Sequence, residues 1–484
     1  MVERQPIGVL ILGCFELEIN RILSTSLKDL NSQISIYGVN RLGTLTQSPE
    51  QWAPDYNLRF LRRVIKTRDL GKNFEAYRAN PLEFGDISCL LERYSHEIRT
   101  WSDQEFVRSL HWESGRVLGN YWIRALVNYN IKRVLFCNTP HNLFDYLGLQ
   151  VARHLGLSTL VTNELRELPN RLYLTQAIVD LDFSSVEHQE TEQVFQSQVS
   201  DHDVEEWLGR IRRLTNPCSR ASVDGLDDQK ARKVYIKGNM QTRLSNYGRI
   251  ALRLHSPYGL IRKALDKQLL RQSKRELSEI TSYNLEALLE EPYVYFPLHQ
   301  QPEATTCPRA GEFVDQRRIV QTLLDGIPAR WKVIVKEHPD QFLKSYPRLR
   351  GFYRDLCSDP RVFVAPVDTP SAVLLKSAVA VVTAGSTAAR QALSLHKPVL
   401  LFGYSPFSAH PYVRRIWTSS DVSRFVQEHE PPVAWDEKED EEFARKLLRQ
   451  TFVGCLSSMN GLSPQQWKSQ SAPLLGFLQS WVNS

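Results

Sequence analysis

Short apolar runs alternate with amphipathic segments in the first part of the chain. Each run has the length and composition of a buried strand, and the segment 142–155 between two of them has helical periodicity. The predicted strands are Ile7–Leu12, Ile34–Val39, Val134–Cys137 and Ser158–Val161. This alternation is typical of a sheet covered by helices, so residues 1–185 are predicted to form a Rossmann-like α/β domain.

The same alternation returns more regularly over residues 286–425, which are predicted to form a second Rossmann-like domain. Strands separated by helices of about ten residues favour a parallel sheet. The predicted strands are Tyr293–Leu298, Lys332–Lys336, Val362–Ala365, Ala378–Thr383 and Pro398–Phe402. The predicted helices are Asp315–Leu324, Tyr346–Cys357, Ser371–Ser377 and Thr387–Leu395.

Two remaining segments have helical and polar patterns. Residues 186–285 are predicted to be a helical, basic insertion or connection, and residues 426–484 to be C-terminal helices. Between Lys230 and Arg275 there are thirteen Lys or Arg residues and one acid, Asp266. Such a stretch suits either an anionic membrane surface or a solvated helix between domains. Without a recognised nucleic-acid-binding module, the charge does not indicate nucleic acid as a partner.

Composition restricts the class of protein. The chain has 484 residues, 42% of them hydrophobic and 24% charged, with a net charge of +6, which fits a globular protein of two domains. Its seven cysteines are scattered, which favours a reducing compartment and argues against a zinc site. The sequence shows no secretion signal and no spanning segment. The expected location is therefore cytoplasmic, with peripheral contact at the inner membrane as an option.

Candidate ligand-binding residues follow two strands of the second domain. After the strand that ends at 383, Gly385 allows a sharp turn and Ser386 and Thr387 open a helix. The start of a helix attracts anions, although Ser and Thr are also ordinary N-caps. After Val335, the sequence Lys336-Glu-His338-Pro339 offers ammonium and imidazole donors to a phosphate, while a histidine with only local hydrogen bonds is the alternative.

Candidate proton-transfer groups lie in two further segments at strand ends. His299 and Glu303, in the segment HQQPE, are candidate bases for an acceptor hydroxyl, although Glu303 can instead cap a turn or pair with Arg309. His141, in NTPH of the first domain, is a candidate acceptor-site group or base, or else a helix-start histidine with local bonds. No convincing metal-binding pattern is present; Asp180 and Asp182 have suitable spacing but no other support. No metal or cofactor is expected.

The motifs together resemble the capsule polysaccharide biosynthesis family, which includes the Kdo transferases of capsule assembly. The resemblance rests on YFPLHQQPEATT at 295–306, VKEHP at 335–339, the segment 359–393, and HKPVLLFG at 396–403. It implies a GT-B architecture, in which two Rossmann-like domains face a cleft, and a nucleotide-sugar donor in the C-terminal half. It also implies that His338, Pro339, Ser386 and Thr387 contact the donor.

Two positions depart from the family pattern STxGxEAL, since Gln391 stands where the acid is usual and Ala389 replaces the glycine. A glutamine accepts hydrogen bonds through one oxygen only, which alters or weakens a ribose contact. The leading hypothesis is a glycosyltransferase that passes a sugar from a nucleotide-sugar donor to a saccharide or lipid-linked acceptor. A nucleotide-sugar epimerase and a non-catalytic paralogue are the alternatives.

Overall fold

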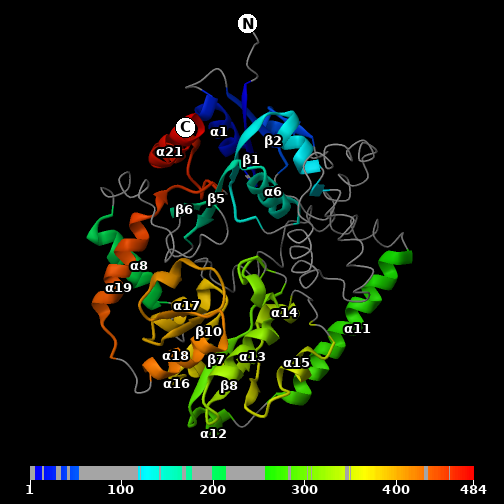
Figure 1. Cartoon of the computed structure of the whole chain (residues 1–484), viewed down its shortest axis with the longest axis vertical. Helices are drawn as coiled ribbons and strands as arrows, with labels where there is room; N and C mark the ends of the chain where they lie inside the picture. Colours follow the sequence, from blue (N-terminus) through cyan, green and yellow to red (C-terminus); the bar gives the residue numbers. More distant parts are fainter. Residues whose placement is uncertain are drawn as a thin grey trace.

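The structure is a computed structural model of the whole chain, and its two sheets occupy opposite halves of the molecule (Figure 1). It describes residues 6–13, 16–28, 34–40, 44–53, 118–119, 121–140, 143–165, 171–176, 199–213, 257–281, 285–301, 303–306, 308–343, 348, 350–429, 434–456 and 458–484.

The N-terminal sheet has seven strands in the order β13-β6-β5-β4-β1-β2-β3. The four central strands, β5, β4, β1 and β2, are parallel, and antiparallel strands extend the sheet at both sides. The strands are β1 (Ile7–Leu12), β2 (Ile34–Val39), β3 (Leu45–Thr46), β4 (Ile131–Phe136), β5 (Ser158–Glu164), β6 (Arg171–Thr175) and β13 (Phe452–Val453). The described helices beside this sheet include α1 (Leu17–Lys28) and α6 (Leu143–His154).

The C-terminal sheet has six strands, and neighbouring strands pair in parallel throughout. Numbered along the chain from β7, its strand order is 3-2-1-4-5-6, the arrangement of a dinucleotide-binding fold. The strands are β7 (Tyr293–Pro297), β8 (Lys332–Lys336), β9 (Val362–Ala365), β10 (Ala380–Thr383), β11 (Val399–Leu401) and β12 (Val413–Arg415). The helices are α12 (Leu285–Leu289), α13 (Gln316–Gly326), α14 (Pro339–Leu343), α15 (Phe352–Leu356), α16 (Ser371–Ser377), α17 (Ser386–Leu393) and α18 (Ser419–His429).

Helices from distant parts of the chain connect the two halves. Helix α8 (Asp201–Arg213) packs against α19 (Glu437–Arg449), and Trp207 of α8 stacks on Phe407 at 6.2 Å between ring centroids. Beyond α19, β13 pairs with β6, while α20 (Pro464–Gln470) and α21 (Ala472–Asn483) pack on α1. The long helix α11 (Pro257–Ile280) lies along the opposite side of the molecule (Figure 1).

The predicted fold class is confirmed, because two mostly parallel α/β sheets are present. Several boundaries were wrong. β4 begins at Ile131, three residues before the predicted start, and β12 was not predicted at all. The helix predicted from Tyr346 begins only at Phe352, since Gly351 has a φ of 81°, in the left-handed region that a right-handed helix cannot include.

The turn after β10 is held close to the turn after β11 by a glycine. A Cβ added to Gly403 would lie 1.9 Å from the carbonyl oxygen of Ala384. Backbone atoms cannot rotate away as a side chain can, so any side chain at this position would push the two turns apart.

We therefore expect Gly403→Ala to lower the free energy of unfolding by about 1–3 kcal/mol, the usual cost of overpacking. Gly476→Ala in α21 is the matched control, because no heavy atom lies within 4 Å of the added Cβ. Replacing a helical glycine by alanine should raise stability by about 0.5–1 kcal/mol. Thermal denaturation followed by circular dichroism measures both variants, and equal melting temperatures would contradict the expectation.

Candidate functional site

The candidate site lies at the carboxyl end of the C-terminal sheet, where the strand order reverses. β7 pairs with β8 on one side and with β10 on the other, so the loops after β7 and β10 leave the sheet in different directions. Open parallel sheets bind ligands at such switch points. His299 follows β7, and Ala384 and Gly385 follow β10.

His299 joins the two loops at this switch point. Its Nε2 accepts a hydrogen bond from the backbone N–H of Ala384 at 2.9 Å and lies 3.2 Å from Oγ1 of Thr383. Burial, together with the charges of His338 and Arg348, lowers the pKa of His299 to about 3. Its imidazole is therefore neutral at pH 7 and carries its proton on Nδ1, since Nε2 is the acceptor.

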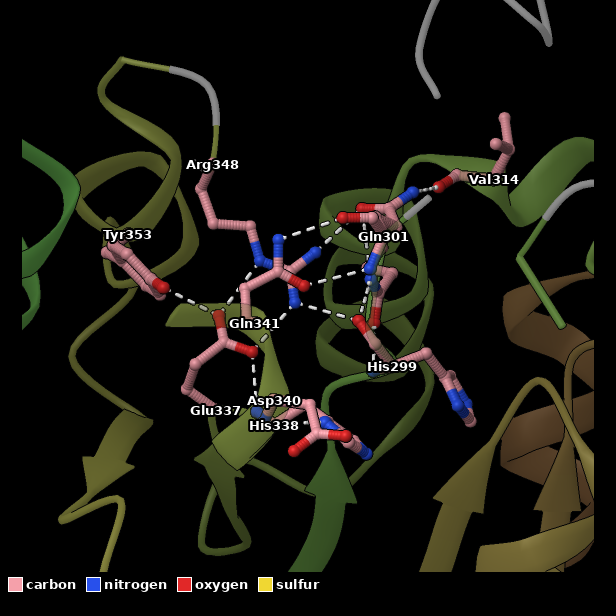
Figure 2. A network of polar contacts seen from close by, with 10 residues as sticks. His299, Gln301, Val314, Glu337, His338, Asp340, Gln341, Arg348 and Tyr353 are labelled. Atoms are coloured by element: carbon pink, nitrogen blue, oxygen red, sulfur yellow. Dashed lines mark hydrogen bonds and ion pairs between the residues drawn. The ribbon is translucent and has the colours of Figure 1, made fainter. Parts of the chain in front are cut away.

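A buried ion pair anchors the neighbouring loop after β8. Both carboxylate oxygens of Glu337 accept from Arg348, at 2.8 Å from Nε and 2.8 Å from Nη2, and the two side chains are 0% and 2% exposed. Tyr353 donates its hydroxyl to Oε2 of Glu337 at 2.6 Å (Figure 2). Burial tends to lower the pKa of Arg348, but the charge and hydrogen bonds of Glu337 together with the contribution of Tyr353 outweigh it, and the net shift is upward.

The same guanidinium reaches the loop after β7. Arg348 donates through Nη2 to the carbonyl oxygen of His299 and through Nη1 to Oε1 of Gln301, both at 2.8 Å. Two fully buried glutamines complete the network, with Gln316 exchanging bonds with the His299 backbone and Gln341 with the Gln301 backbone. The loops after β7 and β8 are thus held as one unit, while the His299 ring points away from this network (Figure 2).

His338 sits on this fixed loop with one ring nitrogen already engaged. Its Nδ1 accepts from the backbone N–H of Asp340 at 3.1 Å. Burial lowers the pKa of His338, against the opposing charges of Asp340, Glu337 and Glu303. At neutral pH the ring is therefore uncharged with its proton on Nε2, which makes Nε2 a hydrogen-bond donor. Pro339 is exposed and begins α14.

Lys336 takes a different direction from His338. The residue is 6% exposed, and its Nζ donates to Oγ of Ser371 at the start of α16, 3.2 Å away. Burial lowers the pKa of Lys336, with the charges of Glu337 and Asp368 opposing the shift. The ammonium group therefore lies between β8 and α16.

Gly385 is the N-cap of α17 and brings no side chain to satisfy the first amide groups of that helix. An added Cβ would lie 2.3 Å from Cγ2 of Thr305, so the loop after β7 packs directly on this turn. Ser386 and Thr387 begin the helix, and their side chains lie outside the described part of the structure. Gln391 is half-buried further along α17.

Of the remaining predicted residues, the structure describes only Glu303. Glu303 is exposed on the loop after β7, near enough for its carboxylate to act on the pKa of His338. His141 lies outside the described residues, as do Asp180 and Asp182. The structure thus brings together His299, Glu303, His338 and Gly385.

The anchoring residues were not identified from the sequence. Glu337 was seen only as a neighbour of His338, and Arg348 fell inside a predicted helix without any chemical role. Gln301, Gln316 and Gln341 also escaped notice, because a glutamine that bonds a backbone has no distinctive sequence pattern. The one available signal was a glutamate directly after a buried strand, where a charge needs a partner.

Within the described part of the chain, no group of three His, Cys, Asp or Glu residues is arranged to hold a metal ion. None of the described helices is long and apolar enough to cross a membrane.

Comparison with known proteins supports the resemblance found in the motifs. Residues 227–411 match the family model described as capsule polysaccharide biosynthesis protein, which confirms the family resemblance over the segment that holds the site. No protein of known, curated function matches the chain.

Solved structures show weaker similarity. Thermosulfurimonas dismutans KpsC, a beta Kdo 2,7 transferase, has 14% identity and a TM-score of 0.33, covering 72% of this chain and 85% of its own. The S. aureus MnaA–UDP co-structure has 12% identity and a TM-score of 0.25, covering 91% of each chain. Anabaena HepE in complex with UDP and glucose has 10% identity and a TM-score of 0.26, covering 98% of this chain and 100% of its own.

Removing one partner of the buried ion pair should destabilise the domain strongly. We expect Arg348→Met to lower the free energy of unfolding by about 3–5 kcal/mol, because Glu337 would remain charged and buried without its partner. The matched control is Arg361→Met, which breaks the Arg361–Asp359 pair, whose side chains are 23% and 28% exposed. That pair should contribute at most about 1 kcal/mol. Urea denaturation measures both, and equal losses would show that burial does not matter here.

The low pKa of His299 predicts a loss of stability in acid. In the unfolded chain the imidazole takes up a proton below its ordinary pKa of 6.5, whereas the folded protein resists protonation until about 3. Unfolding is therefore favoured as pH falls, by up to about 2 kcal/mol between about pH 6.5 and 5.

We expect His299→Gln to reduce this dependence, since an amide does not titrate in this range. Urea denaturation at several pH values gives the slope for each protein. A slope as steep in the variant as in the wild type would mean that other groups cause the acid sensitivity.

Proposed function

We propose that the protein is a glycosyltransferase of GT-B type that moves a sugar from a nucleotide-sugar donor to a surface polysaccharide or glycolipid acceptor. The observation that carries the proposal is the switch point of the C-terminal sheet. There, His299 links the loop after β7 to the start of α17, and the same loop is locked by Arg348 to the segment that bears His338. The match of this segment to the capsule polysaccharide biosynthesis family supports the same reading.

The donor phosphates would lie against the start of α17. Helix N-termini attract anions because their first N–H groups lack intrahelical partners. Gly385 leaves these groups of Ser386 and Thr387 without a side-chain cap, and the Nε2–H of His338 adds a neutral donor on the adjacent loop. Lys336, buried behind this edge, contributes positive potential, and Gln391 on α17 is the group proposed to face the ribose.

In the transfer step, Glu303 is the proposed base. Its exposed carboxylate accepts the proton of the acceptor hydroxyl as the acceptor oxygen bonds to the anomeric carbon. The bond from that carbon to the phosphate oxygen breaks, and the nucleotide leaves with the electron pair. His338 and the α17 amides stabilise the charge that develops on the phosphate, so no metal ion is required in this scheme.

His299 has a positioning role in this scheme. With a pKa of about 3 and its Nε2 bonded to Ala384, its imidazole is a poor proton acceptor at neutral pH. His141 remains a prediction for the acceptor side.

Cytoplasmic location with contact at an anionic inner leaflet is part of the proposal. Lys267, Arg271, Lys274 and Arg275 are exposed on α11, and clusters of this kind favour anionic lipid surfaces. The rest of the basic stretch from Lys230 onward lies outside the described residues or has undescribed side chains.

We expect His338→Ala to weaken nucleotide-sugar binding about 10–150-fold, the usual loss for a hydrogen bond to a charged group. Isothermal titration with UDP, CMP and GDP sugars measures the dissociation constant. His202→Ala on α8 is the matched control, because this histidine is exposed and belongs to a helix outside the C-terminal sheet.

This titration, combined with an assay of nucleotide release, separates donor binding from the transfer step. Glu303→Gln should bind the donor as the wild type does, while release of nucleotide from the sugar falls about 100- to 10,000-fold, as expected on losing a general base. A wild-type protein that binds none of these nucleotides would refute the proposal and favour a non-catalytic paralogue.

A further inference from the structure

We infer that Arg309 is a positioning residue that couples donor binding in the C-terminal domain to the placement of the N-terminal sheet above it. This inference rests on the proposed function, because the donor site is where the coupling begins. Arg309 lies on the loop after β7, the loop that also carries His299 and Glu303.

The side chain of Arg309 crosses from one domain to the other. Its Nη2 donates to Oγ1 of Thr139 at 2.6 Å and to Oδ1 of Asn163 at 3.4 Å. Thr139 lies just beyond the end of β4, and Asn163 is the penultimate residue of β5. The guanidinium therefore joins the carboxyl end of the N-terminal sheet, where an acceptor would lie in the proposed function, to the donor loop.

The N-terminal partners of Arg309 satisfy one another without it. Thr139 donates its hydroxyl to Oδ1 of Asn163 at 2.6 Å, and Asn163 donates through Nδ2 to Oγ1 of Thr175 at 3.2 Å. These three side chains are at most 3% exposed. Withdrawal of the guanidinium leaves no buried donor among them stranded, so these three side chains can keep their mutual bonds when the contact breaks. A contact with this property suits a reversible junction between domains.

A short hydrogen-bonded segment connects Arg309 to the donor site. The Arg309 N–H donates to the carbonyl oxygen of Ala304, and the Thr306 N–H donates to that of Glu303. On the other side, the Arg309 carbonyl accepts from the N–H of Tyr404 in the loop after β11, at 2.7 Å. Movement of Glu303, whose charge acts on the pKa of His338, is thereby transmitted to Arg309 through these hydrogen-bonded turns.

Hydrogen exchange of the full-length protein, with and without saturating UDP, CMP or GDP, tests the coupling. In the wild type, a nucleotide that binds should slow exchange in peptides covering residues 131–139 and 158–164 by at least about fivefold, the lower end of typical coupling between sites. Arg309→Met should bind the nucleotide with an unchanged dissociation constant but lose this protection. Arg309→Lys, which retains a charged donor, should restore part of it.

Arg318→Met is the charge-matched control, because Arg318 is exposed on α13, and it should retain the full protection. Protection that persists in Arg309→Met would overturn the inference, since the nucleotide would then act on the N-terminal sheet by another route. Loss of both nucleotide binding and thermal stability in Arg309→Met would also overturn it, because the role would be structural only. Failure of the wild type to bind any nucleotide would refute the proposed function itself, and the inference with it.

Discussion

The buried pair of Glu337 and Arg348 is the constraint on which the candidate site depends. A carboxylate placed directly after a buried strand is costly unless a cation meets both of its oxygens, and Arg348 does so with two parallel bonds. The remaining donors of the guanidinium then fix the loop after β7. Because one charged group bonds to both loops, the positions of His299 and His338 follow from a single interaction in the interior.

The two histidines show how environment separates chemically identical groups. His299 has its Nε2 occupied by a backbone N–H and is too weakly basic to exchange protons near pH 7, so its contribution is geometric. His338 has the opposite tautomer, with Nδ1 occupied and Nε2–H as the donor. In the proposed reaction, Glu303 is therefore the group that accepts a proton. The negative charge that develops on the leaving phosphate is stabilised by the neutral His338 donor and by the N-terminus of α17.

The strands of the C-terminal domain were largely predictable, because runs such as 332–336 and 362–365 are apolar and bounded by polar turns. β12 was missed since two of its three residues are arginines, so its membership in the sheet depends on its neighbour and not on its own composition. The site was only partly predictable. Residues with distinctive chemistry at strand ends, such as His299 and His338, could be selected from the sequence as candidates, whereas Arg348 and the buried glutamines act through tertiary partners that a linear pattern does not specify.

The return of the chain to its starting domain has a consequence for biosynthesis. β13 and helices α20 and α21 complete the N-terminal sheet and cover α1, although some 400 residues separate them from that helix along the chain. During translation, the strands β7 to β12 emerge consecutively and can assemble without waiting for any later segment. The half that is made first is therefore finished last, and the apolar surface around α1 stays uncovered until the segment 452–483 has emerged from the ribosome.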